Sequence, residues 1–321
     1  IFGEPVYTYT YREAVLDGYL IDHDAPHQLT TKLSEQGIQL KRGDTVKYIN
    51  KQTGELDTAY LDDDVDFDED QFNRRVIVPE FNHYYFSSIL SGIEEEVSAR
   101  GYRIMVSQSK DSYEREVQIC DSFYKYKVCG VIVSQAKGTS KYDHFKKLID
   151  EGMPLVFYDR ICTGVEASRV VVDDYMGAFT AVTHMIDTGC RRIAFYGSSM
   201  TMEISKNRFN GYKDALLKNG LQLDEDLIRL CDNRAAAEAI TPDILSLENC
   251  PDGFFAINDD TAIGILYTAK HMGYHIPDDI SICGFTNGNR AKACDPMLTT
   301  GEQRGEVVGE EAANILIGQV E

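Results

Sequence analysis

Small polar side chains follow several apolar runs of this sequence, at positions where a protein can build a binding site for a small molecule. In the stretch GFFAINDDTAIGIL, a strand-like run, Phe254–Ile257, leads into Asn258, Asp259 and Asp260, and a helical pattern begins there. Side chains of this type either cap the helix by accepting a backbone N–H or face a ligand at the end of the strand. We interpret Asn258 as facing a cleft and Asp259 or Asp260 as capping the helix.

Further candidates stand at other strand ends and helix starts. They are Tyr85, Phe86, Asp159, Arg208, Asn233 and Thr286. Carboxylates and arginine form charge-assisted hydrogen bonds to hydroxyl groups, and aromatic rings pack against a ligand ring. Each residue also has a structural interpretation, since Asp159 could pair with Arg160 and the two aromatic residues could belong to the core. Together they favour a hydroxyl-rich ligand.

The sequence lacks the motifs of catalysis and of metal binding. It contains no G-x-S-x-G, G-x-x-x-x-G-K-[ST] or H-E-x-x-H, and its seven histidines do not cluster. None of the eight cysteines forms a C-x-x-C pair. The acidic run 62–70 lacks the glycine and terminal glutamate of a calcium loop and reads as a solvated face or linker. We therefore predict no enzyme activity, no cofactor and no metal.

The composition limits which classes of partner the protein can bind and indicates its cellular compartment. The formal net charge is −20, which opposes binding to DNA unless a separate basic module provides it. Scattered cysteines fit a reducing compartment, and we see neither a secretory signal nor an apolar run long enough to span a membrane. We expect a cytoplasmic protein without membrane contact.

From about residue 76 the chain alternates apolar runs with amphipathic stretches that end in glycine, which is typical of parallel α/β sheets. The expected strands of the first set are 76–81, 103–109, 129–135 and 154–160, and its helices are 86–101, 114–127 and 142–152. A second set begins at 169–174 and runs to 279–285. Two such sets predict two lobes, each a parallel sheet flanked by helices, with a ligand cleft between them.

Residues 76–321 resemble the effector-binding core of lactose/galactose-repressor-type (LacI/GalR) bacterial transcription regulators. The motifs that carry the resemblance, in the order of that family, are VIVPEFNHYYFSSILSGIEEEVSARGY, VDDYMGAFTAVTHMIDTGCRRIAF, RFNGYKDAL, FFAINDDTAIG, IPDDISICGF and DPMLTTGEQ. The resemblance implies a periplasmic-binding-protein-like fold, a homodimer, and a sugar or other small effector in the cleft. It also implies effector contacts for Tyr85, Phe86, Asp159, Arg208, Asn258 and the position after GF.

This chain departs from the family in two respects. Thr286 stands where the family usually has an aspartate, so the effector could differ from a typical neutral sugar. The DNA-binding headpiece of the family has no counterpart here, so we expect contact with operator DNA only through a headpiece outside this chain. We place the first lobe at 76–174 and 286–321, and the second at 175–285.

Residues 1–77 resemble a segment of the motor subunit of type I restriction endonucleases, most clearly in YTYREAVLDGYLIDH. We treat 1–75 as an appended segment. Two other functions therefore stand beside the regulator core. One is a fragment of that DNA-dependent ATPase, although its nucleotide-binding motifs are missing. The other is a solute-binding transport protein of the same fold, which the lack of a secretory signal disfavours.

Overall fold

The computed structural model of the protein describes residues 38–40, 45–49, 56–60, 65–67, 73–80, 83–125 and 128–320. The chain divides into two compact units, Ile1–Glu69 and Asp70–Glu321. In the first unit, two strand pairs are antiparallel: β1 (Ile38–Leu40) with β4 (Val65–Phe67), and β2 (Thr45–Ile49) with β3 (Leu56–Tyr60). Most of the appended segment and of the acidic run lies outside the described residues.

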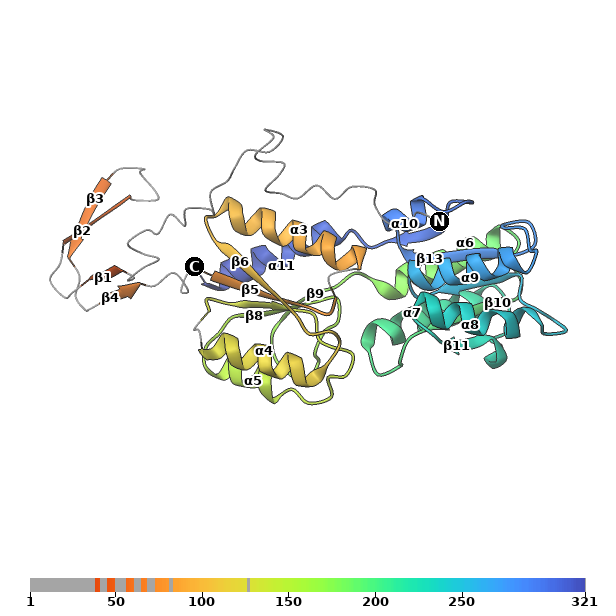
Figure 1. Cartoon of the computed structure of the whole chain (residues 1–321), viewed down its shortest axis with the longest axis horizontal. Helices are drawn as coiled ribbons and strands as arrows, with labels where there is room; N and C mark the ends of the chain where they lie inside the picture. The colour runs from red at the N-terminus through yellow and green to blue at the C-terminus, as the bar shows by residue number, and fades with distance from the viewer. Residues whose placement is uncertain are drawn as a thin grey trace, which may run out of the picture. The chain divides into compact units, whose positions relative to one another are not determined.

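The second unit begins with a five-stranded, fully parallel sheet (Figure 1). Its order is β6 (Arg103–Gln108), β5 (Asn73–Val78), β7 (Val131–Val133), β8 (Leu155–Tyr158) and β9 (Ser168–Val170). The helices that connect or cover these strands are α3 (Tyr84–Ala99), α4 (Tyr113–Lys125), α5 (Asp143–Asp150) and α11 (Gly305–Val320).

Alternation along β5 explains why helices cover both faces of this sheet. Val76 and Val78 point to one face and pack against α3 and α11, where Ile89 and Ala312 lie in the same core cluster. Ile77 points to the other face and packs with residues of α4 and α5. Successive side chains of a strand face opposite sides, so an apolar run such as VIV must be buried on both.

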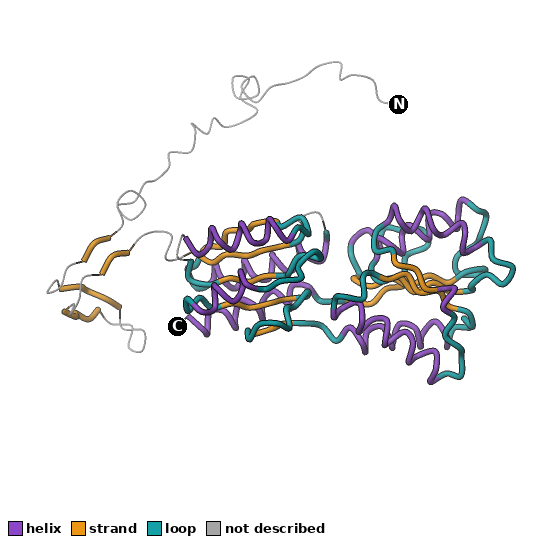
Figure 2. Tube along the Cα trace, turned by 90° about the horizontal axis from the view of Figure 1, so that it is seen from below, coloured by secondary structure: helices purple, strands orange, loops and turns teal. Residues whose placement is uncertain are grey.

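A second parallel sheet follows, with the order β11 (Ile228–Leu230), β10 (Ile193–Gly197), β12 (Gly253–Ala256), β13 (Ser281–Thr286) and β14 (Thr299–Glu302). Helices again lie on both faces (Figure 2). They are α6 (Asp174–Asp187), α7 (Glu203–Lys218), α8 (Arg234–Leu245) and α9 (Asp259–His271), with the short helices η2 (Glu225–Leu227) and α10 (Asn289–Lys292) in connections. The predicted α/β architecture of two parallel sheets flanked by helices is confirmed.

Two of the predicted boundaries differ from the structure. β5 starts at Asn73, three residues before the expected start of the first lobe. β14 pairs in parallel with β13, so Thr299–Glu302 belongs to the second sheet, although 286–321 was assigned to the first lobe. The chain returns to the first lobe after this strand, and α11 packs against α3 there. Within the part of the chain that the structure describes, every helix is too short or too polar to cross a membrane.

Candidate functional site

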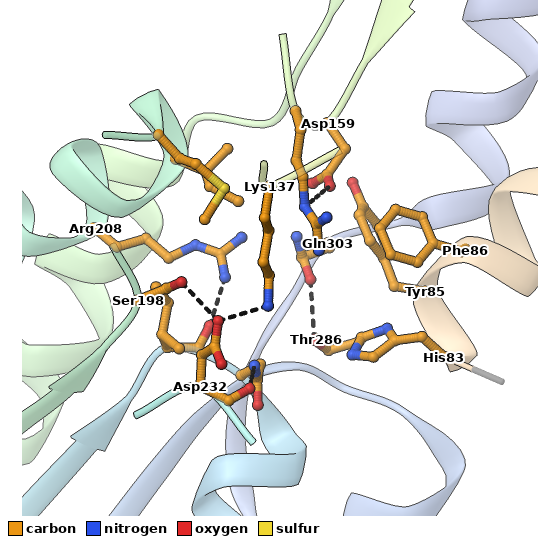
Figure 3. A pocket seen from close by; sticks show the side chains of 15 residues that line it. His83, Tyr85, Phe86, Lys137, Asp159, Ser198, Arg208, Asp232, Thr286 and Gln303 are labelled. Atoms are coloured by element: carbon orange, nitrogen blue, oxygen red, sulfur yellow. Dashed lines mark hydrogen bonds and ion pairs between the residues drawn. The ribbon is translucent and has the colours of Figure 1, made fainter. Parts of the chain in front are cut away.

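A pocket lies between the two lobes, beyond the carboxyl ends of strands from both sheets (Figure 3). Parallel sheets bind ligands at this edge because the polar ends of their strands and connecting loops converge there. The pocket is lined by His83, Tyr85, Phe86, Lys137, Asp159, Arg160, Ser198, Met202, Ile204, Arg208, Asp232, Ile257, Asn258, Thr286 and Gln303. Six of the seven predicted site residues are therefore brought together.

Tyr85 and Phe86 enter the pocket from the first turn of α3. Tyr85 is buried, and among the described residues its hydroxyl has no hydrogen-bond partner. Burial, reinforced by the nearby Asp159 carboxylate, raises the pKa of Tyr85, so its hydroxyl stays protonated. The ring of Phe86 packs edge-on against Tyr158, with centroids 6.4 Å apart, and the Arg160 guanidinium lies 5.5 Å from its centroid. The pair thus offers an apolar ring and a hydroxyl to one ligand.

Asp159 follows β8 and takes a left-handed backbone conformation, with φ at 55°. This conformation is uncommon for residues other than glycine and often marks a functional position. Its backbone N–H donates to the carbonyl of Val170 at 3.1 Å, which fixes the turn. Burial raises the pKa of the carboxyl to about 6, although the positive charge of Arg160 opposes this shift. Nε of Arg160 lies 4.0 Å from Oδ2, too far for a hydrogen bond.

Arg208 lines the pocket from α7, but most of its hydrogen bonds are to the protein itself. Its Nε and Nη2 donate to Oδ1 of Asp174 at 2.8 and 2.7 Å, and its Nη1 donates to the carbonyl of Ile257. The guanidinium also stacks 4.0 Å from the ring centroid of Phe285. Arg208 therefore joins α6, α7 and the end of β12. The N–H groups of its guanidinium that make no such bond can donate to a ligand.

Asn258 has the two roles that the sequence left as alternatives. Its Oδ1 accepts from the N–H of Thr261 at 2.8 Å, which makes it the N-cap of α9, and it also lines the pocket. The expectation that Asp259 or Asp260 caps this helix is wrong, because the helix begins one residue earlier than assumed. Asp259 instead accepts from the N–H of Gly288 and the hydroxyl of Thr300, at 2.8 and 2.5 Å.

Asn233 is the predicted site residue that the structure does not place in the pocket. It is the N-cap of α8, and its Oδ1 accepts from the N–H of Ala236 at 3.0 Å. The preceding Asp232, two residues after the end of β11, lines the pocket instead. Thr286 is buried in the pocket wall, and its hydroxyl donates to Oε1 of Gln303 at 3.0 Å.

Comparison with known proteins agrees with this architecture. A family model described as a periplasmic binding protein-like domain matches residues 182–321. The HTH-type transcriptional repressor CytR of Escherichia coli strain K12 is 28% identical over 250 residues, covering 77% of this chain and 72% of CytR. From about residue 76, this chain is therefore similar to the effector-binding cores of LacI/GalR-type regulators.

Solved structures of LacI-type regulators share the fold of this core. CcpA of Lactococcus lactis superposes with a TM-score of 0.72 at 22% identity, covering 78% of this chain and 91% of that one. A LacI family regulator from Enterococcus faecium, solved with bound ribose, gives 0.69 at 23% identity, covering 77% and 90%. These relatives are transcription regulators rather than enzymes. The comparisons do not support the resemblance of residues 1–77 to a restriction-endonuclease motor subunit.

The pocket also contains residues that were not predicted from the sequence. The polar and charged ones are Lys137, Ser198, Asp232 and Gln303; His83 and Arg160 also line the pocket. Ser198 directly follows β10, and Lys137 comes four residues after β7, so the rule that indicated Asp159 and Asn258 could have found both. Gln303 follows β14, a strand that the sequence pattern did not predict.

Proposed function

We propose that this chain senses a small, hydroxyl-rich effector, such as a sugar, in the pocket between its lobes. The observation that carries the proposal is a set of buried side-chain atoms on the pocket wall that have no hydrogen-bond partner among the described residues. They are Oη of Tyr85, Nε of Arg160 and Nδ1 of His83. Buried polar groups are rarely left unpaired, because each loses the hydrogen bonds that it would make to water.

The chemistry of these groups favours a neutral polyol over an anion. The Tyr85 hydroxyl and Nε of Arg160 donate, whereas the Asp159 carboxylate, which also lines the pocket, accepts. A sugar hydroxyl both donates and accepts, so one ring can satisfy all three groups. The cations that line the pocket are already paired, Lys137 with Asp232, Arg160 with Asp111 and Arg208 with Asp174. An anionic ligand would also meet the carboxylate of Asp159. The aromatic face of Phe86 adds an apolar surface for the ring of a sugar.

Sensing would follow from the division of the pocket between the lobes. Tyr85 and Asp159 belong to the first lobe, and Arg208 and Asn258 to the second, so one ligand contacts both. A ligand that binds one lobe arrangement better shifts the population toward it. We propose that a homodimer transmits this shift to DNA-binding headpieces that contact the operator, in the cytoplasm. The net charge of −20 agrees with DNA contact through a separate module.

Isothermal titration calorimetry with a panel of monosaccharides and oligosaccharides tests the effector site. For a sugar that binds, Tyr85→Phe should weaken the affinity about tenfold, because a hydrogen bond to the buried hydroxyl is lost. It should leave the free energy of unfolding unchanged or higher, because this hydroxyl has no hydrogen-bond partner among the residues that the structure describes. The neighbouring Tyr84 is 40% exposed, and Tyr84→Phe is the matched control.

Two outcomes would contradict this assignment. One is a panel in which no sugar binds. The other is a sugar whose affinity is the same in the unmodified protein, in Tyr85→Phe and in Asp159→Asn, because that sugar must bind elsewhere.

A further inference from the structure

Lys137 and Asp232 form an ion pair that joins the two lobes across the pocket. Nζ of Lys137 lies 2.7 Å from Oδ2 of Asp232 (Figure 3). Lys137 follows β7 in the first sheet, whereas Asp232 follows β11 in the second. Neither residue belongs to the set of ligand-binding positions predicted from the sequence.

Asp232 is the fixed partner of this pair. The Ser198 hydroxyl donates to the same Oδ2 at 2.6 Å, and Nδ2 of Asn258 donates to the backbone carbonyl of Asp232 at 2.9 Å. Burial by itself raises the pKa of Asp232, but hydrogen bonds from Lys137 and Ser198 outweigh it and lower that pKa. The second lobe thus holds an ionised acceptor rigidly in the pocket wall.

Lys137 is the movable partner, although the loop that carries it is anchored. Glu116 accepts from the N–H of Ala136 at 2.7 Å and from the hydroxyl of Thr139 at 2.5 Å, which holds the backbone on either side of Lys137. The lysine side chain itself is 38% exposed and has a flexible four-carbon stem. A partly exposed ion pair of this kind is weak, so Nζ can exchange Asp232 for water at little cost.

The pocket is too small for a sugar while Lys137 stays bound to Asp232. The cavity has a volume of about 70 Å³, whereas pockets that hold small organic ligands usually measure roughly 300–1,000 Å³. A sugar therefore needs the wall to move. Withdrawal of Lys137 would free Oδ2 of Asp232 and remove the bond that holds the lobes together at this point.

We propose that Asp232 is an effector-binding residue and that Lys137 is its internal competitor. A hydroxyl group of the effector replaces Nζ as the donor to Oδ2, and the interlobe ion pair breaks as the effector binds. This inference rests on the proposed function. It links occupancy of the pocket to the arrangement of the lobes, and it disfavours effectors that place an anionic group beside Asp232.

Calorimetry on three variants, with a sugar that binds the unmodified protein, tests the exchange. Lys137→Met should bind that sugar about two- to fivefold more tightly, because the competitor is gone and a half-exposed ion pair contributes little. Asp232→Asn should bind it about tenfold or more weakly, because a charge-assisted hydrogen bond is lost. Lys141→Met changes the charge equally at an exposed position near Lys137 and should leave the affinity unchanged.

The affinities of these variants distinguish a failure of the Lys137 exchange from a failure of the proposed effector site. Weaker binding by Lys137→Met would show that Lys137 holds the effector, and it would overturn the competition. A second outcome is that Tyr85→Phe weakens binding, whereas Lys137→Met and Asp232→Asn leave the affinity unchanged. This outcome would overturn the exchange between Lys137 and the effector and leave the effector site in place. A panel in which no sugar binds contradicts both.

Fluorescence energy transfer provides a readout that does not depend on an effector. Dyes on unnatural amino acids at the exposed positions Lys146 and Asn207 report the distance between the lobes. In the protein without sugar, Lys137→Met should widen the distribution of this distance, and Lys141→Met should not. An unchanged distribution in Lys137→Met would show that the ion pair does not hold the lobes together, and would overturn that part of the inference.

Discussion

Arg208 and Asp174 form a buried ion pair between α7 and the first turn of α6, with Nη2 2.7 Å from Oδ1. Their side chains are 5% and 4% exposed. The same guanidinium reaches the carbonyl of Ile257, next to the pocket. A residue expected from the sequence to hold the effector is thus also part of the scaffold of the second lobe.

Arg208→Met is therefore expected to lower the free energy of unfolding by roughly 3–5 kcal/mol, because it leaves the Asp174 carboxylate buried without its partner. Urea unfolding measures this loss. The double variant Arg208→Met/Asp174→Asn removes both charges and should recover part of it. A loss below about 1 kcal/mol in the single variant, as for an exposed ion pair, would contradict the structural role.

Asn258→Ala should affect both folding and effector binding. Loss of the N-cap of α9 is expected to cost about 1 kcal/mol, and loss of the hydrogen bond to the Asp232 carbonyl should loosen the pocket wall. Asn233→Ala is the matched control, because Asn233 caps α8 in the same way but lies outside the pocket. It should cost a similar amount in urea unfolding and leave sugar affinity by calorimetry unchanged. Equal effects of the two variants on affinity would argue against ligand contact by Asn258.

Asp159 should make stability depend on pH. Its pKa is raised from 3.8 to about 6, so the folded protein binds this proton more tightly than the unfolded chain does. The resulting stabilisation is present below about pH 4 and is lost as the pH rises to about 6, an effect of about 3 kcal/mol. Asp159→Asn should remove this pH dependence and be the more stable protein at pH 7. Urea unfolding of both proteins between pH 4 and 7 measures the difference, and parallel profiles would contradict it.

The Asp159 carboxyl group should also make the affinity for the effector depend on pH. A hydroxyl of the effector donates best to an ionised carboxylate, so sugar affinity should fall as the pH drops below about 6. Calorimetry at pH 5 and 7 measures this change. Asp159→Asn should bind weakly at both values, which would distinguish Asp159 from other groups that titrate in this range.

Gly309 allows α11 to approach α3 closely. A Cβ at this position would lie 2.1 Å from the carbonyl oxygen of Ile89, which is too close for any atom. Gly309→Ala is expected to lower the free energy of unfolding by about 1–3 kcal/mol, because the helices must move apart. In the same helix, a Cβ at Gly318 would meet no atom within 4 Å. Gly318→Ala should therefore be neutral or stabilising by up to about 1 kcal/mol. Thermal or urea unfolding that ranks the two variants equally would contradict the close contact.

The fold was largely predictable because its signals are local. Runs such as VIV at 76–78 and FFAI at 254–257 must be buried on both faces, and amphipathic stretches that end at Gly101 or Gly152 return the chain to the sheet. The boundaries were less predictable. Thr299–Glu302 has no apolar character of its own, and it becomes a strand because β13 offers an unpaired edge.

By itself, the sequence indicated two parallel α/β lobes, a resemblance of the core to LacI/GalR-type regulators, and six residues of the pocket: Tyr85, Phe86, Asp159, Arg208, Asn258 and Thr286. The lobes and the pocket follow from side-chain periodicity and from the rule that polar residues at strand ends converge, whereas the resemblance rests on motifs such as FFAINDDTAIG. Only the tertiary structure decided that Asp232, and not Asn233, faces the pocket, and that Lys137 reaches it from the other lobe. The physical reason is that a cap and a pocket residue can be adjacent in sequence, and a contact between lobes depends on distances across the fold that no local pattern encodes.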